Sequence, residues 1–244
     1  SDKKKENLLN TMLAYSYLIK VFRPHDMMAC ATSALREAEN GPQIVEALKK
    51  ATGIDLQVID GQKESQLIGQ THFISAFNPS IHYLYIDVGG GSTEISLFSK
   101  RYPSASQSFK VGTLRMLNGR IDPYEWSQMK RFIKGMIPKK GKLAALGTGG
   151  NISKSFSLVG GKDSSKPVSV KKLEKLFGEL KSLSVKDRIL KMGLKPDRAE
   201  VIVPGLEIYL ACMKWGKINQ IYIPKVGLSD GLVYHLYKKY TDQR

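Results

Sequence analysis

The sequence predicts a mixed α/β fold, and two observations favour it. Helical and strand-like apolar patterns alternate along the first 77 residues in the order helix, strand, helix, strand, helix, which is typical of a layer with crossover connections. Two later apolar strands run directly into glycine-rich turns at 89–92 and 147–150. Such turns let backbone N–H groups approach an anion closely, because glycine has no Cβ.

Each expected element has its own local signal. The first helix shows helical spacing and ends before Pro24, and the second closes at Gly53, a usual residue beyond a helix end. Helices are expected at 7–22, 41–52, 60–77, 123–134, 170–183, 185–192, 198–215 and 228–240. Strands are expected at 26–30, 56–59, 83–88, 93–98, 142–146 and 218–223, with short strands continuing to about residue 113. A turn cluster at 78–80 marks a boundary between two lobes.

The net charge of +16 is the strongest compositional signal. A positive field raises the local concentration of any polyanion, so nucleic acid, anionic membrane, nucleotide and inorganic polyphosphate all qualify on charge alone. The basic runs carry no interleaved aromatic residues and no RNA-recognition pattern, so we expect no nucleic-acid partner. Without a span-length apolar stretch, we expect no membrane partner. Cys30 and Cys212 lie among apolar residues, which is typical of reduced cysteines in a cytoplasmic protein.

The segment from Asp87 to Glu94 carries the main chemical signal. Two strands joined by three glycines and two hydroxyl residues form a hairpin, and its N–H groups can point at an anion. If Val88 pairs with Thr93, the two acids lie directly opposite each other. Facing carboxylates are unfavourable alone, and a divalent cation, expected to be Mg²⁺, would reconcile them and bridge to phosphate. The alternative is a plain glycine-rich hairpin with solvated carboxylates.

Three further segments carry weaker signals. The turn at 147–150 follows a strand and precedes a helix whose N-terminus suits an anion, although an ordinary strand-to-helix turn fits equally well. Ser33 and Arg36 follow the first strand and can grip a phosphate; the alternative is a helix cap with a surface arginine. Glu64 lies in the first turn of a helix, where a carboxylate usually only complements the helix dipole.

Taken together, these motifs resemble the exopolyphosphatase and guanosine-pentaphosphate phosphohydrolase family of the actin-like ATPase superfamily. The resemblance extends in order over nearly the whole chain, through the segments 31–36, 58–64, 87–94, 147–150, 201–205 and 227–231. It implies an actin-like, ribonuclease H-like fold of two lobes with the active site in the cleft between them. The first lobe would comprise 1–79, joined by the closing helix 228–242, and the second lobe would comprise 80–227.

The resemblance also implies roles for individual residues. Glu64 stands where the family has its catalytic carboxylate, the general base for the attacking water. Asp87 and Glu94 match the acidic pair that the family associates with Mg²⁺ and water. The residues at positions expected to contact or lie near phosphate are Ser33, Arg36, Gly89, Gly90, Gly91, Ser92, Thr93, Gly147, Thr148, Gly149 and Gly150.

Two departures from the family pattern matter. The family usually has Glu-Glu where this chain has Lys63-Glu64, so only the second acid carries over. Family members also begin with a strand-turn-strand that bears a first phosphate loop of the Asp-x-Gly-Ser-Asn-Ser type. The sequence starts at Ser1, just ahead of the expected first helix, and shows no such segment before that helix. The first lobe is therefore expected to lack its opening strands here. Either a segment is omitted, or the protein is a natural variant without half of its phosphate clamp; we expect omission, because missing central strands would expose sheet edge and apolar surface.

The expected reaction is Mg²⁺-assisted hydrolysis of the terminal phosphoanhydride of inorganic polyphosphate. Three alternatives stay open: hydrolysis of the 5′ phosphate of guanosine pentaphosphate, non-catalytic binding of polyphosphate or of the alarmone, and an actin-like ATPase or sugar kinase. The last is disfavoured because the Glu64 carboxylate has no role in those schemes. The sequence does not decide whether the protein forms a homodimer.

Overall fold

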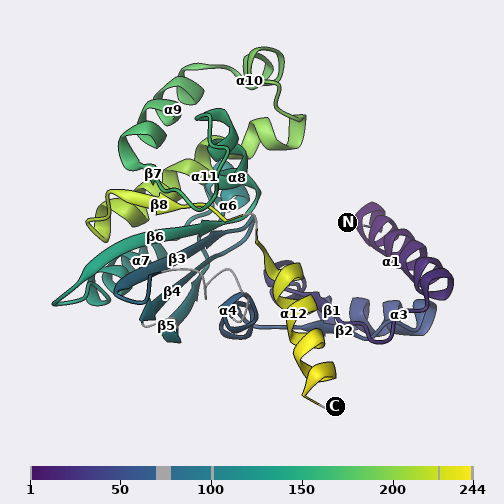
Figure 1. The fold of residues 1–244 in the computed structure, drawn as a ribbon. Helices are drawn as coiled ribbons and strands as arrows, with labels where there is room; N and C mark the ends of the chain where they lie inside the picture. Colours follow the sequence, from purple (N-terminus) through teal and green to yellow (C-terminus); the bar gives the residue numbers. More distant parts are fainter. Residues whose placement is uncertain (1, 70–77, 100–101, 225, 243–244) are drawn as a thin grey trace.

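The computed structural model describes residues 2–69, 78–99, 102–224 and 226–242, and its fold is mixed α/β, as predicted (Figure 1). The strands are β1 Ala29–Ala31, β2 Leu56–Val58, β3 Ile81–Val88, β4 Thr93–Ser99, β5 Tyr102–Phe109, β6 Lys142–Thr148, β7 Val168–Ser169 and β8 Gln220–Tyr222. The helices are α1 Asp2–Phe22, α2 Ser33–Arg36, α3 Gly41–Thr52, α4 Gly61–Gly69, α6 Thr113–Leu117, α7 Pro123–Gly135, α8 Gly150–Leu158, α9 Val170–Ser182, α10 Val185–Met192, α11 Pro196–Trp215 and α12 Leu228–Thr241. Of the helices in these ranges, none has both the length and the apolarity needed to cross a membrane.

The larger sheet has the strand order β5-β4-β3-β6-β8-β7. Its first three strands form an antiparallel meander, while β6 is parallel to β3 and β8 is parallel to β6. Since β3 and β6 are parallel neighbours, their carboxyl ends meet at one edge, where Asp87 pairs with Thr148. The topology therefore brings the two glycine-rich turns of the sequence side by side.

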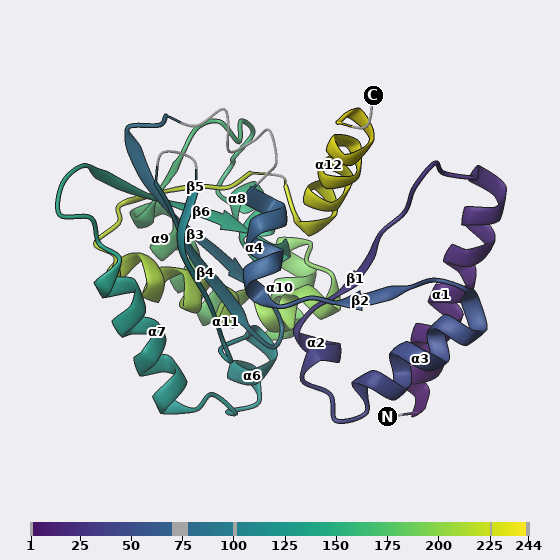
Figure 2. The same ribbon diagram turned by 90° about the horizontal axis from the view of Figure 1, so that it is seen from below.

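Helices cover both faces of this sheet (Figures 1 and 2). On one face, α7, α8, α9 and α11 enclose the main core, to which β3 contributes Leu84 and Ile86. On the other face, α4 supplies Ile68 to a smaller cluster with Tyr83 and Tyr85. Because side chains alternate along a strand, odd-numbered positions of β3 face α4 and even-numbered positions face the main core.

The N-terminal elements form a separate group beside the sheet (Figure 2). β1 and β2 pair in parallel as a two-stranded sheet, and α1 and α3 pack on it through Met12 and Leu48. α12 connects this group to the rest, since it packs on α4 and Lys239 forms a 3.0 Å ion pair with Asp26. The division into lobes at 79/80 and 227/228 stays a prediction.

Most predicted elements are present, and the differences have local causes. The helices predicted at 41–52 and 185–192 are confirmed at both ends. The strand predicted at 26–30 was wrong in its placement, because β1 pairs with the three residues of β2 and so occupies Ala29–Ala31. The helix predicted at 60–77 begins at Gly61 and is described to Gly69, and 70–77 lie outside the described residues. The short elements α2, α6 and β7 were not predicted.

We predict that Gly231 is required for the packing of α12 on α4. A Cβ at this position would lie 2.6 Å from the backbone carbonyl of Leu67, so Gly231→Ala must push the helices apart. We expect the free energy of unfolding to fall by about 1–3 kcal/mol, measured by urea denaturation. Gly178 of α9 is the matched control, since a Cβ there meets nothing within 4 Å and Gly178→Ala should stabilise by up to about 1 kcal/mol. Equal changes in the free energy of unfolding for Gly231→Ala and Gly178→Ala would contradict the close packing of α12 on α4 at Gly231.

Candidate functional site

The hairpin between β3 and β4 places two acids face to face. Val88 pairs with Thr93, and Asp87 pairs with Glu94, so the predicted register is confirmed. The neighbouring Ile86 belongs to the main core, and strand alternation therefore turns both acids toward the face that α4 covers. The hairpin thus directs two carboxyl groups at the start of another helix.

The start of α6 binds the carbonyl oxygens of the hairpin loop. The N–H of Thr113 donates to the carbonyl of Gly89 at 3.0 Å, and the N–H of Leu114 donates to that of Gly90 at 2.9 Å. These are the N–H groups that a helix leaves unsatisfied at its N-terminus. The loop is therefore fixed in one peptide orientation by a helix of only five residues.

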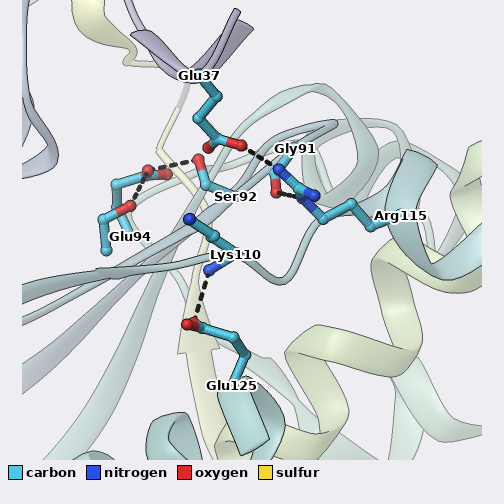
Figure 3. Close-up of polar contacts among 8 residues, drawn as sticks. Glu37, Gly91, Ser92, Glu94, Lys110, Arg115 and Glu125 are labelled. Carbon is cyan, nitrogen blue, oxygen red and sulfur yellow. Dashed lines mark hydrogen bonds and ion pairs between the residues drawn. The ribbon is translucent and has the colours of Figure 1, made fainter. Parts of the chain in front are cut away.

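This orientation leaves the opposite edge of the loop free to bind an anion. Arg115 Nε donates to the carbonyl of Gly91 at 2.7 Å (Figure 3), so three successive carbonyls point toward α6. Among the described residues, the N–H groups of Gly90, Gly91 and Ser92 have no hydrogen-bond partner. Successive unpaired N–H groups form a concave site for an anion.

A cavity of about 600 Å³ lies beside this loop, between α2, the first turn of α4 and α6. It is lined by Thr32, Ser33, Ala34, Glu37, Ala38, Glu64, Asp87, Gly89, Gly90, Gly91, Ser92, Glu94, Leu114, Arg115, Asn118 and Arg120. The structure therefore brings the predicted base, the predicted acidic pair, Ser33 and the loop residues 89–92 together around one space.

The position of Glu64 follows from how α4 begins. The N–H of Lys63 donates to Oδ1 of Asp60 at 2.7 Å, which caps the helix N-terminus. Gly61 lets the first turn approach the sheet, since a Cβ there would lie 2.8 Å from that of Ser108. This close packing holds the Glu64 side chain at the cavity beside the acidic pair.

Electrostatics disfavours ionisation of Glu64 in the folded protein. The pKa of Glu64 is raised to about 8, mainly by burial and further by the charges of Glu94 and Asp87, with Arg36 opposing the shift. A carboxyl group with a pKa near the working pH is suited to proton transfer.

In the acidic pair, Glu94 is buried and Asp87 is half-buried, and hydrogen bonds oppose the effect of burial on both pKa values. Burial raises the pKa of Asp87, and hydrogen bonds with Tyr85 and Thr148 partly offset this increase. Burial likewise raises the pKa of Glu94, and the hydrogen bond from Ser92 is the main opposing cause. Three carboxyl groups that repel one another in one cavity need positive charge if they are to ionise together.

A network of buried hydroxyl groups supports Asp87 from behind. The Tyr85 hydroxyl donates to Oδ2 of Asp87 at 3.1 Å and lies 2.7 Å from Oγ1 of Thr148. The Tyr209 hydroxyl accepts from the N–H of Val88 at 3.2 Å and donates to the carbonyl of Thr148. The network ties the end of β3 to the end of β6 and fixes the direction of the Asp87 carboxylate.

Asp87 and Glu94 fit a hard divalent cation. The hydroxyl of Ser92 donates to Oε1 of Glu94 at 2.7 Å (Figure 3), and the hydroxyl of Ser108 donates to the same oxygen at 3.0 Å. Within the described part of the chain, Oε2 of Glu94 accepts no hydrogen bond. No group of three or more His, Cys, Asp and Glu side chains in these residues is arranged as a metal cage. Mg²⁺ commonly uses only one or two carboxylates, with water and phosphate completing its shell.

Two residues that were predicted to contact phosphate, Arg36 and Thr93, do not line the 600 Å³ cavity. The Nη1 of Arg36 donates to the carbonyl of Ile59 at 2.8 Å and holds α2 to the end of β2. The side chain of Thr93 is fully buried, and its hydroxyl donates to the carbonyl of Val111 at 2.5 Å. Both side chains are used to position the chain around the cavity.

The second glycine turn divides into a buried part and an accessible part. Gly147 and Thr148 are buried, and a Cβ on Gly147 would meet Ile221 at 2.7 Å. Neither residue lines the 600 Å³ cavity or the 400 Å³ cavity beside it. Gly149 and Gly150 line a second cavity of about 400 Å³, which shares Asp87, Gly89 and Gly90 with the first. The predicted adjacency of the two turns is therefore present, although only the last two residues of the second turn reach an open surface.

Sequence reasoning missed the charged residues in and directly after α2 and α6. Glu37, Arg115 and Arg120 line the cavity, and none of them belongs to a recognised motif. The one local signal was Gly112-Thr113, a glycine followed by a helix-capping residue type, but five helical residues are too few to show a period.

We predict that Gly112 is needed for the loop geometry. A Cβ on Gly112 would lie 2.4 Å from the carbonyl oxygen of Gly90 and 2.5 Å from the carbonyl carbon of Gly91. Gly112→Ala should therefore destabilise the protein by about 1–3 kcal/mol in urea denaturation. Gly135→Ala is the control, because a Cβ on Gly135 meets nothing within 4 Å. A Gly112→Ala protein as stable as the control would contradict the close approach.

A second prediction concerns the pH dependence of stability. Because the pKa of Glu64 is raised to about 8 in the folded protein against about 4.3 unfolded, its contribution to stability is complete below about pH 4.3 and is lost as pH rises through 8. Glu64→Gln cannot ionise, so its advantage over the unsubstituted protein should grow between pH 5 and pH 9. We expect about 1–3 kcal/mol by urea denaturation in EDTA, reduced by water in the open cavity. A difference that is constant with pH would exclude the raised pKa.

The chain was compared with known proteins. It is 26% identical over 231 residues to exopolyphosphatase 1 of Mycobacterium tuberculosis (strain CDC 1551 / Oshkosh), a match that covers 85% of this chain and 66% of that protein's length. It is 24% identical over 219 residues to guanosine-5′-triphosphate,3′-diphosphate pyrophosphatase of Aeromonas salmonicida (strain A449), covering 84% of this chain and 44% of that protein.

Solved structures share the fold. The exopolyphosphatase from Cytophaga hutchinsonii superposes with a TM-score of 0.83 at 20% identity, covering 98% of this chain and 83% of that one. The Ppx/GppA family member of Aquifex aeolicus gives a TM-score of 0.77 at 22% identity with the same two coverages. The model of the Ppx/GppA phosphatase family matches residues 1–240. The cavity, its facing acids and this match agree: the chain belongs to the Ppx/GppA phosphatase family.

Proposed function

We propose that the chain hydrolyses the terminal phosphoanhydride of inorganic polyphosphate, with Glu64 as general base. The observation that carries this proposal is one cavity that combines three partnerless N–H groups, at Gly90, Gly91 and Ser92, with the carboxyl of Glu64. N–H groups bind a phosphate and a carboxyl accepts a proton from water, so the two requirements of phosphoanhydride hydrolysis meet in one place.

Each part of the cavity has a distinct role in this scheme. The terminal phosphate lies on the N–H edge of residues 90–92, opposite Ser33 of α2. Glu64 holds and deprotonates the water that attacks the phosphorus in line with the leaving oxygen. The lining residues come from 1–79 on one side and 80–227 on the other, which supports an active site between two lobes.

A divalent cation, proposed to be Mg²⁺, would be held by Asp87 and Glu94, where it would neutralise the charge of the phosphate oxygens. The charges of the lining support this role. Four acids, Glu37, Glu64, Asp87 and Glu94, face this cavity with two arginines, Arg115 and Arg120. A polyanion enters such a lining only when positive charge accompanies it.

The test of the base is Glu64→Gln. This change keeps the size of the side chain and removes its ability to accept a proton, so we expect turnover of polyphosphate to fall by about 10²–10⁴-fold while polyphosphate binding is retained. Phosphate release and equilibrium binding are measured on the same preparation. Glu46→Gln is the control, since Glu46 is an exposed residue of α3 paired with Lys50. Unchanged turnover in Glu64→Gln would remove the base assignment.

Guanosine pentaphosphate is the second candidate substrate, and the second cavity favours it. The 400 Å³ cavity at Gly149 and Gly150 adjoins the first at Asp87, which gives room for a bulkier group beyond the reacting phosphate. Comparison of phosphate release from polyphosphate and from guanosine pentaphosphate separates the two. Binding of either compound without any phosphate release would instead support a non-catalytic polyanion sensor.

A further inference from the structure

Arg115 occupies a position between the loop and α2 (Figure 3). Its Nε donates to the carbonyl of Gly91 at 2.7 Å, and its Nη2 forms an ion pair with Oε2 of Glu37. The two side chains are partly exposed, at 30% for Arg115 and 24% for Glu37, and both line the 600 Å³ cavity. The pair therefore borders the space in which the N–H groups of the loop are open.

The guanidinium has more hydrogen-bonding capacity than these contacts use. Arginine carries five N–H donors in a planar fork, and the contacts with Gly91 and Glu37 use two of them. The bond to Gly91 fixes the guanidinium on the peptide whose N–H group is one of the three partnerless donors. A planar fork at this place is suited to bidentate binding of a phosphate.

Glu37 opposes the same ligand. Glu37 is the residue directly after α2, and it lines the same cavity as the loop. It therefore competes with a phosphate for the Arg115 guanidinium and also repels the phosphate directly. Neither residue belongs to the set that the sequence motifs identify.

We propose that Arg115 is a phosphate-binding residue whose guanidinium is shared with Glu37 until a phosphate ligand displaces that carboxylate. This inference rests on the proposed function, because it requires a polyphosphate in the 600 Å³ cavity. It assigns opposite effects to two residues that form one ion pair. Loss of Arg115 weakens binding of the ligand, and loss of the Glu37 charge strengthens it.

The test is equilibrium binding of tripolyphosphate at fixed free Mg²⁺, measured by isothermal titration calorimetry in the Glu64→Gln background, where hydrolysis is expected to be slow. Glu37→Gln should tighten binding about threefold to fivefold, the range of a partly exposed ion pair. Arg115→Gln should weaken it at least about tenfold, because it removes a charged donor from the ligand. Thermal unfolding of each variant reports whether the fold is retained.

Two controls separate displacement from a general charge effect. Glu125→Gln removes one negative charge on α7, close to the loop but outside the cavity lining (Figure 3), and should leave the affinity unchanged. In the double variant Glu37→Gln/Arg115→Gln, the gain from Glu37→Gln should disappear, because no guanidinium is left to release.

The outcomes are distinguishable. Weaker binding in both single variants would show that the pair only holds the structure together, and would overturn this inference while leaving the proposed function intact. A gain from Glu37→Gln that persists in the double variant would reduce Glu37 to simple repulsion and also overturn it. Absence of tripolyphosphate binding in the Glu64→Gln protein and all its derivatives would overturn the proposed function together with this inference.

Discussion

The site depends on the hydrogen bonds between the hairpin loop and the start of α6. The N–H groups of Thr113 and Leu114 and the Nε of Arg115 hold three successive carbonyl oxygens on one side. A peptide plane carries its N–H opposite its carbonyl, so the same bonds present the N–H groups of the loop to the cavity. Gly112 makes this approach feasible, since any side chain there would overlap the loop backbone. The proposed anion site is thus built from the backbone alone, and these hydrogen bonds fix its geometry.

The cavity has the opposite charge balance from the whole chain. The protein carries a net charge of +16, yet acids outnumber arginines by four to two around the cavity. The exterior field attracts polyanions of any kind, whereas in the proposed function the acids of the cavity would admit a polyanion only together with a cation. Burial raises the pKa of Asp87 and Glu94. Their charged forms are therefore disfavoured unless a positive charge lies beside them, which strengthens the requirement for a cation. Net charge could therefore predict the class of ligand but not the place where the ligand binds.

The parts of the site that could be predicted from the sequence are those set by local geometry. A hairpin with a short loop fixes its own register, so the pairing of Asp87 with Glu94 followed from the loop length alone. The place of Glu64 did not, because it depends on the packing of Gly61 against Ser108, which are 47 residues apart in the sequence. The same limit applies to α2 and α6, which are too short to show a helical period. The resemblance to a family did predict that Glu64 belongs to the site, because family motifs reflect contacts in the folded protein. The spacing of residues in one sequence does not contain those contacts.

The proposed base, Glu64, and the proposed anion site at the loop are held by different contacts, and Ser108 connects them. α6 orients the loop, whereas the first turn of α4 positions Glu64 through the contact of Gly61 with Ser108. The hydroxyl of Ser108 also donates to Oε1 of Glu94 at 3.0 Å. One side chain of β5 therefore touches the helix that carries the base and also orients a member of the acidic pair. Because the charge of Glu94 contributes to the raised pKa of Glu64, a change in the packing of α4 on β5 alters the distance of the base from the loop and the strength of that base together.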